Sequence, residues 1–181
     1  VFTLFKSHPR VFFSYLGWGG EATLYGTFWP IFLILIFESI LSYGGIVSAS
    51  ILLAILTSYF MGNLVDKLKS GKIIRVGIFL GVLTWVIRIV SYWPLLIVFL
   101  DGFYRLSEQM FALTMDVFSY KKARQGGTCQ ALFFREISLN LGAAVFLLLT
   151  ILFLFLGFPL WFIFILGLCG SLSPILINKR I

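Results

Sequence analysis

The chain has 181 residues, of which 60% are hydrophobic, 18% aromatic and only 12% charged. A soluble domain of this size exposes far more polar surface, so the composition excludes an ordinary soluble protein and indicates a membrane protein. The formal net charge is +7, but the basic residues stand between apolar runs, which favours anionic lipid headgroups over nucleic acid as their partner.

Six apolar stretches are long enough to cross a bilayer as helices, because a hydrocarbon core of about 30 Å requires roughly 20 residues. Barrel strands fit these runs less well, since such strands are about ten residues long and alternate polar with apolar side chains. The sequence therefore predicts an all-α membrane protein with a single six-helix domain. The expected spans are residues 11–37, 43–64, 73–92, 94–120, 128–156 and 158–177.

The first span contains a cluster of glycines, Gly17, Gly19 and Gly20, directly before Glu21, and Pro30 lies further along. The glycines either unwind the helix at a binding site or permit close helix packing, and both interpretations are open. A carboxyl group near the bilayer midplane is costly and is commonly part of a binding site or a proton relay, so Glu21 is a candidate proton carrier.

Every second connection between the spans is basic. The basic segments are residues 6–10, 67–75, 121–124 and 179–180, whereas the turns at 38–42, 91–94 and 157–159 carry no Lys or Arg. The positive-inside rule therefore places both termini in the cytoplasm. We expect an integral protein of the plasma (inner) membrane, with the bilayer as its first partner.

The connection after the second span reads GNLVDKLKSGK. Six helices with both ends inside and this loop resemble one half of a major facilitator superfamily transporter, whose loop in this place reads roughly Gly-x-Leu-x-Asp-(Arg/Lys)-x-Gly-(Arg/Lys)-(Arg/Lys). Gly62, Leu64, Asp66 and Lys67 match this pattern, whereas Lys69 stands where the family has glycine. The resemblance covers the whole chain by topology and about a dozen residues by motif.

The resemblance implies two three-helix repeats within the domain and a cytoplasmic gate at this loop. The implied gate residues are Gly62, Asp66, Lys67, Lys69 and Lys72. An aspartate at the inner end of a helix would face a helix N-terminus of the other half, an interaction worth about 0.3–1 kcal/mol when exposed. The alternative is that this basic loop only sets the topology.

Ionisable residues also lie inside the predicted spans, where each costs at least about 2.5–3.5 kcal/mol unless it faces the bundle interior, a partner or water. Asp101, Arg105 and Glu108 follow at i, i+4 and i+7 and share one helix face. Arg88 has Asp101 as a plausible partner, although snorkelling would also suffice. We therefore place Glu21, Asp101, Arg105, Glu108, Arg135, Glu136 and Asn140 as candidate residues of a transport cavity.

Two interpretations of these charges are open. They either form ion pairs that lock the helices together, or some of them line a cavity that binds a polar solute or carries a proton. On the fifth span Glu136 and Asn140 share a face, while Arg135 points elsewhere and could pair with Glu108.

The remaining residues argue against catalysis and cofactors. The single histidine, His8, precedes the first span, and no nucleophile, zinc or hydrolase motif is present, so we do not expect an enzyme. Cys129 and Cys169 lack metal-ligand spacing and are expected as reduced core thiols, and no metal or other cofactor is predicted. Trp29 and two further tryptophans, Trp93 and Trp161, are expected in an aromatic belt at the outer interface.

The predicted function is that of a half-transporter that moves a small polar or amphiphilic solute by alternating access, possibly coupled to protons. A six-helix chain alone would leave its polar stripe facing lipid, so its second six-helix half would come from a longer chain, from a homodimer or from a separate subunit. The alternative is a membrane subunit that scaffolds a complex without transporting anything.

Overall fold

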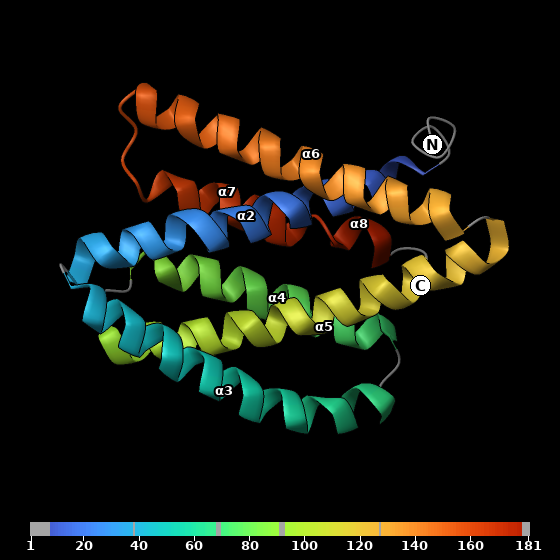
Figure 1. The fold of residues 1–181 in the computed structure, drawn as a ribbon, viewed down its shortest axis with the longest axis horizontal. Coiled ribbons are helices and arrows are strands. Elements are labelled where there is room, and N and C mark those ends of the chain that lie inside the picture. The colour runs from blue at the N-terminus through green and yellow to red at the C-terminus, as the bar shows by residue number, and fades with distance from the viewer. Residues whose placement is uncertain (1–7, 38, 68–69, 91–92, 127, 179–181) are drawn as a thin grey trace.

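The computed structural model describes residues 8–37, 39–67, 70–90, 93–126 and 128–178, and in these ranges the chain folds into helices without strands. The helices, numbered as in Figure 1, are α2 (Pro9–Phe37), α3 (Ile40–Lys67), α4 (Ser70–Arg88), α5 (Pro94–Gly126), α6 (Thr128–Phe155), α7 (Phe162–Leu172) and α8 (Ile175–Asn178). The predicted all-α class is confirmed for these residues.

Two of the helices are long and apolar enough to cross a membrane. They are α2 and the Cys129–Phe155 part of α6, whereas the apolar stretches Leu41–Leu56 and Phe162–Ile177 are shorter. The outer surface is apolar as well: Leu41 and Phe155 are each 87% exposed, and many other large hydrophobic side chains lie open. Such a surface is typical of a protein that contacts lipid or another protein rather than water.

The first expected span is a single helix, because α2 continues without interruption past Gly17, Gly20 and Pro30. The last span is instead divided into α7 and α8 at Ser173 and Pro174. Proline has no N–H to donate and its ring clashes with the preceding turn, so the helix ends before it and restarts after it.

The helices run antiparallel in two layers. In Figure 1 α6, α2, α5 and α3 lie toward the viewer, and the fading colour places α4 and α7 behind them. The beginnings of α2, α4 and α6 lie at the same end of the bundle as the last turns of α3 and α5 (Figure 1). Arg10, Lys72 and Arg75, near the beginnings of α2 and α4, therefore share that end, whereas Arg88 in the last turn of α4 lies at the opposite end.

Glycines let the backbone of α2 come into direct contact with α6 and α7. A Cβ on Gly19 would collide with the carbonyl oxygen of Leu139 on α6, and a Cβ on Gly142 would collide with that of Leu16 on α2. On the other side of α2, a Cβ on Gly17 would meet the side chain of Ser173 next to α7. The structure therefore favours the packing interpretation of the glycine cluster.

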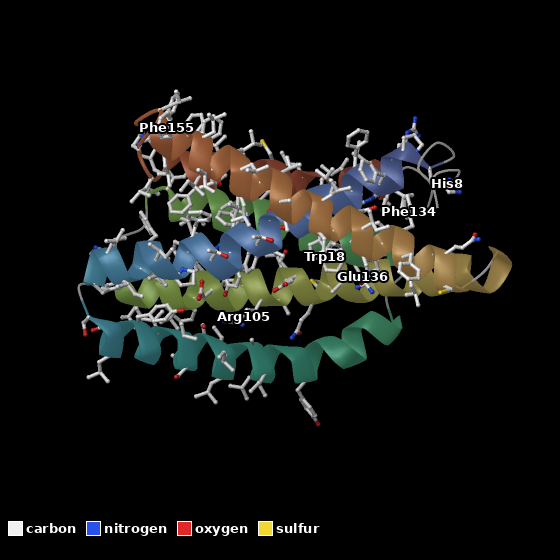
Figure 2. The ribbon with its side chains drawn as sticks, turned by 45° about the horizontal axis from the view of Figure 1, so that its top comes forward. His8, Trp18, Arg105, Phe134, Glu136 and Phe155 are labelled. Carbon is white, nitrogen blue, oxygen red and sulfur yellow. The ribbon has the colours of Figure 1, made fainter. Side chains whose placement is uncertain are left out.

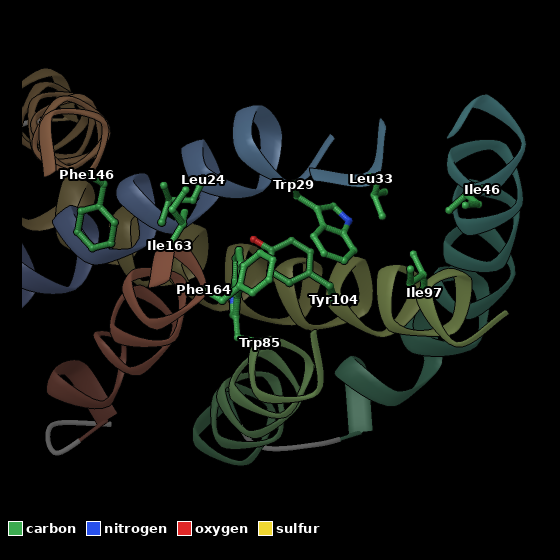
Figure 3. Packing of buried hydrophobic residues seen from close by; sticks show 10 residues of the cluster. All are labelled: Leu24, Trp29, Leu33, Ile46, Trp85, Ile97, Tyr104, Phe146, Ile163 and Phe164. Atoms are coloured by element: carbon green, nitrogen blue, oxygen red, sulfur yellow. The ribbon is translucent and has the colours of Figure 1, made fainter. Parts of the chain in front are cut away.

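Two apolar clusters fill the bundle. One, shown in Figure 3, consists of Leu24, Trp29, Leu33, Ile46, Trp85, Ile97, Tyr104, Phe146, Ile163 and Phe164. The other consists of Val11, Tyr15, Trp18, Ile74, Ile78, Phe111, Met115, Phe134 and Ile177. Glu21 lies on α2 between Trp18 of the second cluster and Leu24 of the first, so a carboxyl group separates the two apolar regions.

We predict that Gly19→Ala lowers the stability of the protein by about 1–3 kcal/mol, because the added methyl group forces α2 and α6 apart. Gly26→Ala on the same helix is the matched control, since a Cβ there meets no atom within 4 Å. Alanine also favours the helix by about 1 kcal/mol over glycine, so the control is expected to gain stability. The measurement is thermal unfolding in detergent followed by circular dichroism, and equal midpoints for the two variants would contradict the packing argument.

Candidate functional site

Arg88 at the end of α4 forms a fully buried ion pair with Asp101 on α5. Nη2 of Arg88 lies 2.9 Å from Oδ1 of Asp101, and the two side chains are 0% and 2% exposed. Trp29 on α2 donates its indole N–H to the same oxygen at 2.7 Å. The predicted Arg88–Asp101 pair is confirmed, and it joins three helices because each supplies one member of the group.

Aromatic rings enclose the Arg88 guanidinium. Its central carbon lies 4.2 Å from the ring centre of Trp29, 4.8 Å from those of Trp85 and Tyr104, and 5.1 Å from that of Tyr25. Nε and Nη1 of Arg88 have no hydrogen-bond partner among the described residues. The negative faces of the rings therefore stabilise the charge that one carboxylate only partly satisfies.

Glu21 lies at the junction of α2, α4 and α7. Its Oε1 accepts a hydrogen bond from Nε1 of Trp85 at 2.7 Å and another from Oγ of Ser171 at 2.5 Å. The residue is only 8% exposed. Gly170 makes this approach possible, because a Cβ there would lie 2.7 Å from the Cβ of Glu21.

A small cavity of about 20 Å³ adjoins Glu21. It is enclosed by α2, α4, α5 and α7 and is lined by Trp18, Glu21, Gly77, Ile78, Gly81, Tyr104, Ser107, Glu108, Phe111, Ser171 and Pro174. Ser107 donates to the carbonyl oxygen of Gly77 at 2.6 Å, which ties α5 to α4 beside the cavity. The cavity thus brings together the carboxyl groups of Glu21 and Glu108, which are 87 positions apart in the sequence.

Arg105 and Glu108 on α5 are both half-buried. The Arg105 guanidinium lies 5.7 Å from the ring centre of Tyr25, which itself stacks on Tyr104 at 4.0 Å. Nε of Arg105 is buried without a hydrogen-bond partner among the described residues. Figure 2 shows Arg105 on α5, Trp18 on α2 and Glu136 on α6, the helices of the front layer that carry these polar side chains.

Three neighbouring polar residues of α6, Arg135, Glu136 and Asn140, are more accessible than Glu21. The guanidinium of Arg135 is 5.7 Å from the ring centre of Trp18, and its Nη1 is 4.0 Å from Oε1 of Glu136. Glu136 is exposed, with 58% of its side chain accessible, and so is Asn140, whose amide donates to the Glu136 carbonyl oxygen at 2.8 Å. The three side chains of this group belong to the front layer but do not line the cavity.

The expected gate is mostly outside the described side chains. Gly62, Asp66 and Lys67 lie in the last turns of α3, where the structure describes the backbone and not their side chains. Lys69 lies outside the described residues, and Lys72 is exposed in the first turn of α4. The gate therefore stays a prediction.

The solvent exposure of Trp29 and of the two cysteines differs from what the sequence predicts. Trp29 does not belong to an interfacial belt, because it is 2% exposed and binds Asp101, whereas Trp93 and Trp161 are exposed. Cys129 and Cys169 are free but exposed rather than core thiols. Among the described residues, no three His, Cys, Asp or Glu side chains come together as metal ligands.

The sequence interpretation missed the roles of Trp85 and Ser171. Both residues lie within apolar spans, and no motif in the sequence marks either of them as a hydrogen-bond donor to Glu21. The run of small and polar residues from Gly167 to Ser173, interrupted by few large side chains, was the available signal of close contact with another helix.

Comparisons of the chain with known protein families, with curated proteins and with solved structures find no match.

We predict that Asp101→Asn lowers stability by about 3–5 kcal/mol, because Asn still accepts from Trp29 but leaves Arg88 as a buried charge without a counter-ion. The double variant Arg88→Met with Asp101→Asn removes both charges and is expected to lose clearly less than the single variant. Thermal or denaturant unfolding in detergent measures both. Additive losses would mean that the pair contributes no mutual stabilisation.

Proposed function

We propose that the chain is one six-helix lobe of a secondary transporter of the major facilitator type, which moves a small polar or amphiphilic solute by alternating access. The observation that carries this proposal is the set of charged side chains in the front layer that are not buried within the bundle. Glu136 is exposed, and Arg105, Glu108 and Arg135 are only half-buried.

The energy of such charges in lipid supports a second lobe. A charged side chain at the centre of a membrane helix costs at least about 2.5–3.5 kcal/mol when it faces hydrocarbon. Glu136 lies in the third turn of α6, so in a lone bundle its carboxylate would meet lipid. A facing lobe that encloses water would remove this cost, and the water would provide the solute pathway.

The proposal treats α2, α3, α4, α5, α6 and the pair α7–α8 as six spans with both termini in the cytoplasm. It is supported by the common end of the bundle that Arg10, Lys72 and Arg75 occupy, because basic residues collect on the cytoplasmic side. The sequence resemblance adds Asp66, with Lys67, as the inner gate of this lobe.

A non-transporting scaffold is the second candidate. The favouring observation is the tight interior: the Arg88–Asp101 pair is fully enclosed, and the cavity beside Glu21 is only about 20 Å³. In a scaffold, the polar edge of α6 would be covered permanently by a partner protein, so no water would reach Asn140.

We predict that a cysteine placed at Asn140 reacts with a membrane-impermeant maleimide in intact membranes, because the proposed pathway contains water. The native Cys129 and Cys169 are first replaced by serine. Leu152→Cys, on an exposed apolar part of the same helix, is the matched control and is expected to react many-fold more slowly, since lipid covers it. Mass spectrometry of the labelled protein measures the rates.

Alternating access also requires that the pathway opens to both sides of the membrane. The Asn140→Cys protein is expected to react when the reagent is added to either side of the membrane. A protein in which Asn140→Cys is as unreactive as Leu152→Cys would have no aqueous pathway at this face, and the scaffold would then be the better description.

A further inference from the structure

The cavity between α2, α4, α5 and α7 has the size of a small ligand site. Its volume of about 20 Å³ is sufficient for one water-sized species, since a buried water requires at least about 10–15 Å³. It lies between the two apolar clusters, where an unfilled polar cavity would leave its polar groups without partners.

One buried polar group at this cavity lacks a partner among the described residues, and a carboxyl group there has one oxygen without a recorded hydrogen bond. Both hydrogen bonds of Glu21 within the described part of the chain end on Oε1, which leaves Oε2 available to an occupant. Trp18, which is 8% exposed, lines the cavity, and its Nε1 is buried with no hydrogen-bond partner among the described residues. The occupant must therefore offer positive charge or a donor to the carboxylate and an acceptor to the indole.

The charge around the cavity selects the sign of the occupant. Two carboxyl groups, those of Glu21 and Glu108, belong to its lining, and no lysine or arginine is among the lining residues that the structure describes. The charged and titratable groups near Glu21 are Glu108, Arg105 and Tyr104 on α5, Arg88 on α4, Asp101 as the partner of Arg88, and Tyr25 on α2. Arg88 is already held by Asp101, and Arg105 on α5 acts on Glu108, so Glu21 is the carboxyl group without an arginine of its own and the pair together keeps an excess of negative charge.

We propose that this cavity binds a small monovalent cation between Glu21 and Glu108, one species at a time: either a water molecule that carries a proton or a single sodium ion. In the first case the water accepts from Trp18, and in either case carboxylate and hydroxyl oxygens surround the cation. Ser107 and Ser171 supply the hydroxyl groups. Oxygen groups of this kind are the ligands that hard cations prefer.

The position of the two carboxyl groups also provides a route. Glu108 is half-buried and lies on the helix that carries the half-exposed Arg105, whereas Glu21 is buried at the junction of three helices. A cation that enters beside Glu108 therefore reaches Glu21 within the same cavity. Its role as the coupling ion rests on the proposed transport function, because only a transporter would use the energy of its entry.

The test uses the full chain in lipid nanodiscs and two readouts that require neither solute nor a partner lobe. Thermal unfolding is compared in sodium chloride and in choline chloride, and infrared difference spectra between acidic and neutral pH report the C=O stretch of a protonated carboxyl group. We expect either a sodium-dependent rise in the unfolding midpoint, which identifies sodium, or a carboxyl band that appears with acid, which identifies the proton.

Variants assign the signal to the cavity. Glu108→Gln and Glu21→Gln are each expected to abolish it, and glutamine at residue 21 retains an acceptor for Trp85 and Ser171. Trp18→Phe is expected to weaken it several-fold. Glu136→Gln removes a carboxyl group outside the cavity and is expected to keep the signal. If Glu21→Gln does not fold, Glu108→Gln decides alone, because that side chain is half-buried.

Absence of both signals in the folded wild-type protein, or their persistence in Glu108→Gln, would overturn the cation site. The outcome is separable from that of the transport proposal. A cation signal without aqueous labelling at Asn140→Cys would retain this site and reject transport. Aqueous labelling without a cation signal would reject this site and retain transport.

Discussion

The close approach of α2 to α6 and α7 is the constraint on which the rest of the structure depends. It is possible only because glycines replace side chains where the backbones cross, at Gly19 and Gly142 on one side and at Gly17 and Gly170 on the other. With α7 at this distance, Ser171 reaches the carboxyl group of Glu21. Larger residues at these positions would move the helices apart and take one of its two donors from that carboxyl group in a region of low polarity.

The charged residues of the helices differ in how fully the bundle encloses them. Arg88 and Asp101 are closed off by aromatic rings, so their contribution is structural and their removal concerns stability. Glu21 and Glu108 share a cavity, and Glu136 is exposed on α6. A bundle that buries one ion pair completely and leaves other charges at its front layer has a rigid interior and a polar side that requires water or a partner.

Much of the architecture follows from local patterns in the sequence. The all-helical class and most helix boundaries agree with the apolar runs. Arg88 forms the expected ion pair with Asp101. The errors have physical causes. Pro174 divides the last span because proline cannot continue a hydrogen-bonded helix, and Trp29 turns inward because a buried carboxylate offers its indole N–H a better partner than the interface does.

The sequence by itself determined that helices form, roughly where they begin and end, and that several charges would lie along them, because these properties depend on composition and on spacing within single segments. Only the tertiary structure decided which charges are satisfied. The Ser171–Glu21 and Trp85–Glu21 hydrogen bonds join residues 150 and 64 positions apart, and Glu108 meets the same cavity from a fourth helix. Such contacts depend on how each helix is rotated and how closely it crosses its neighbours, and no pattern within one helix contains that information.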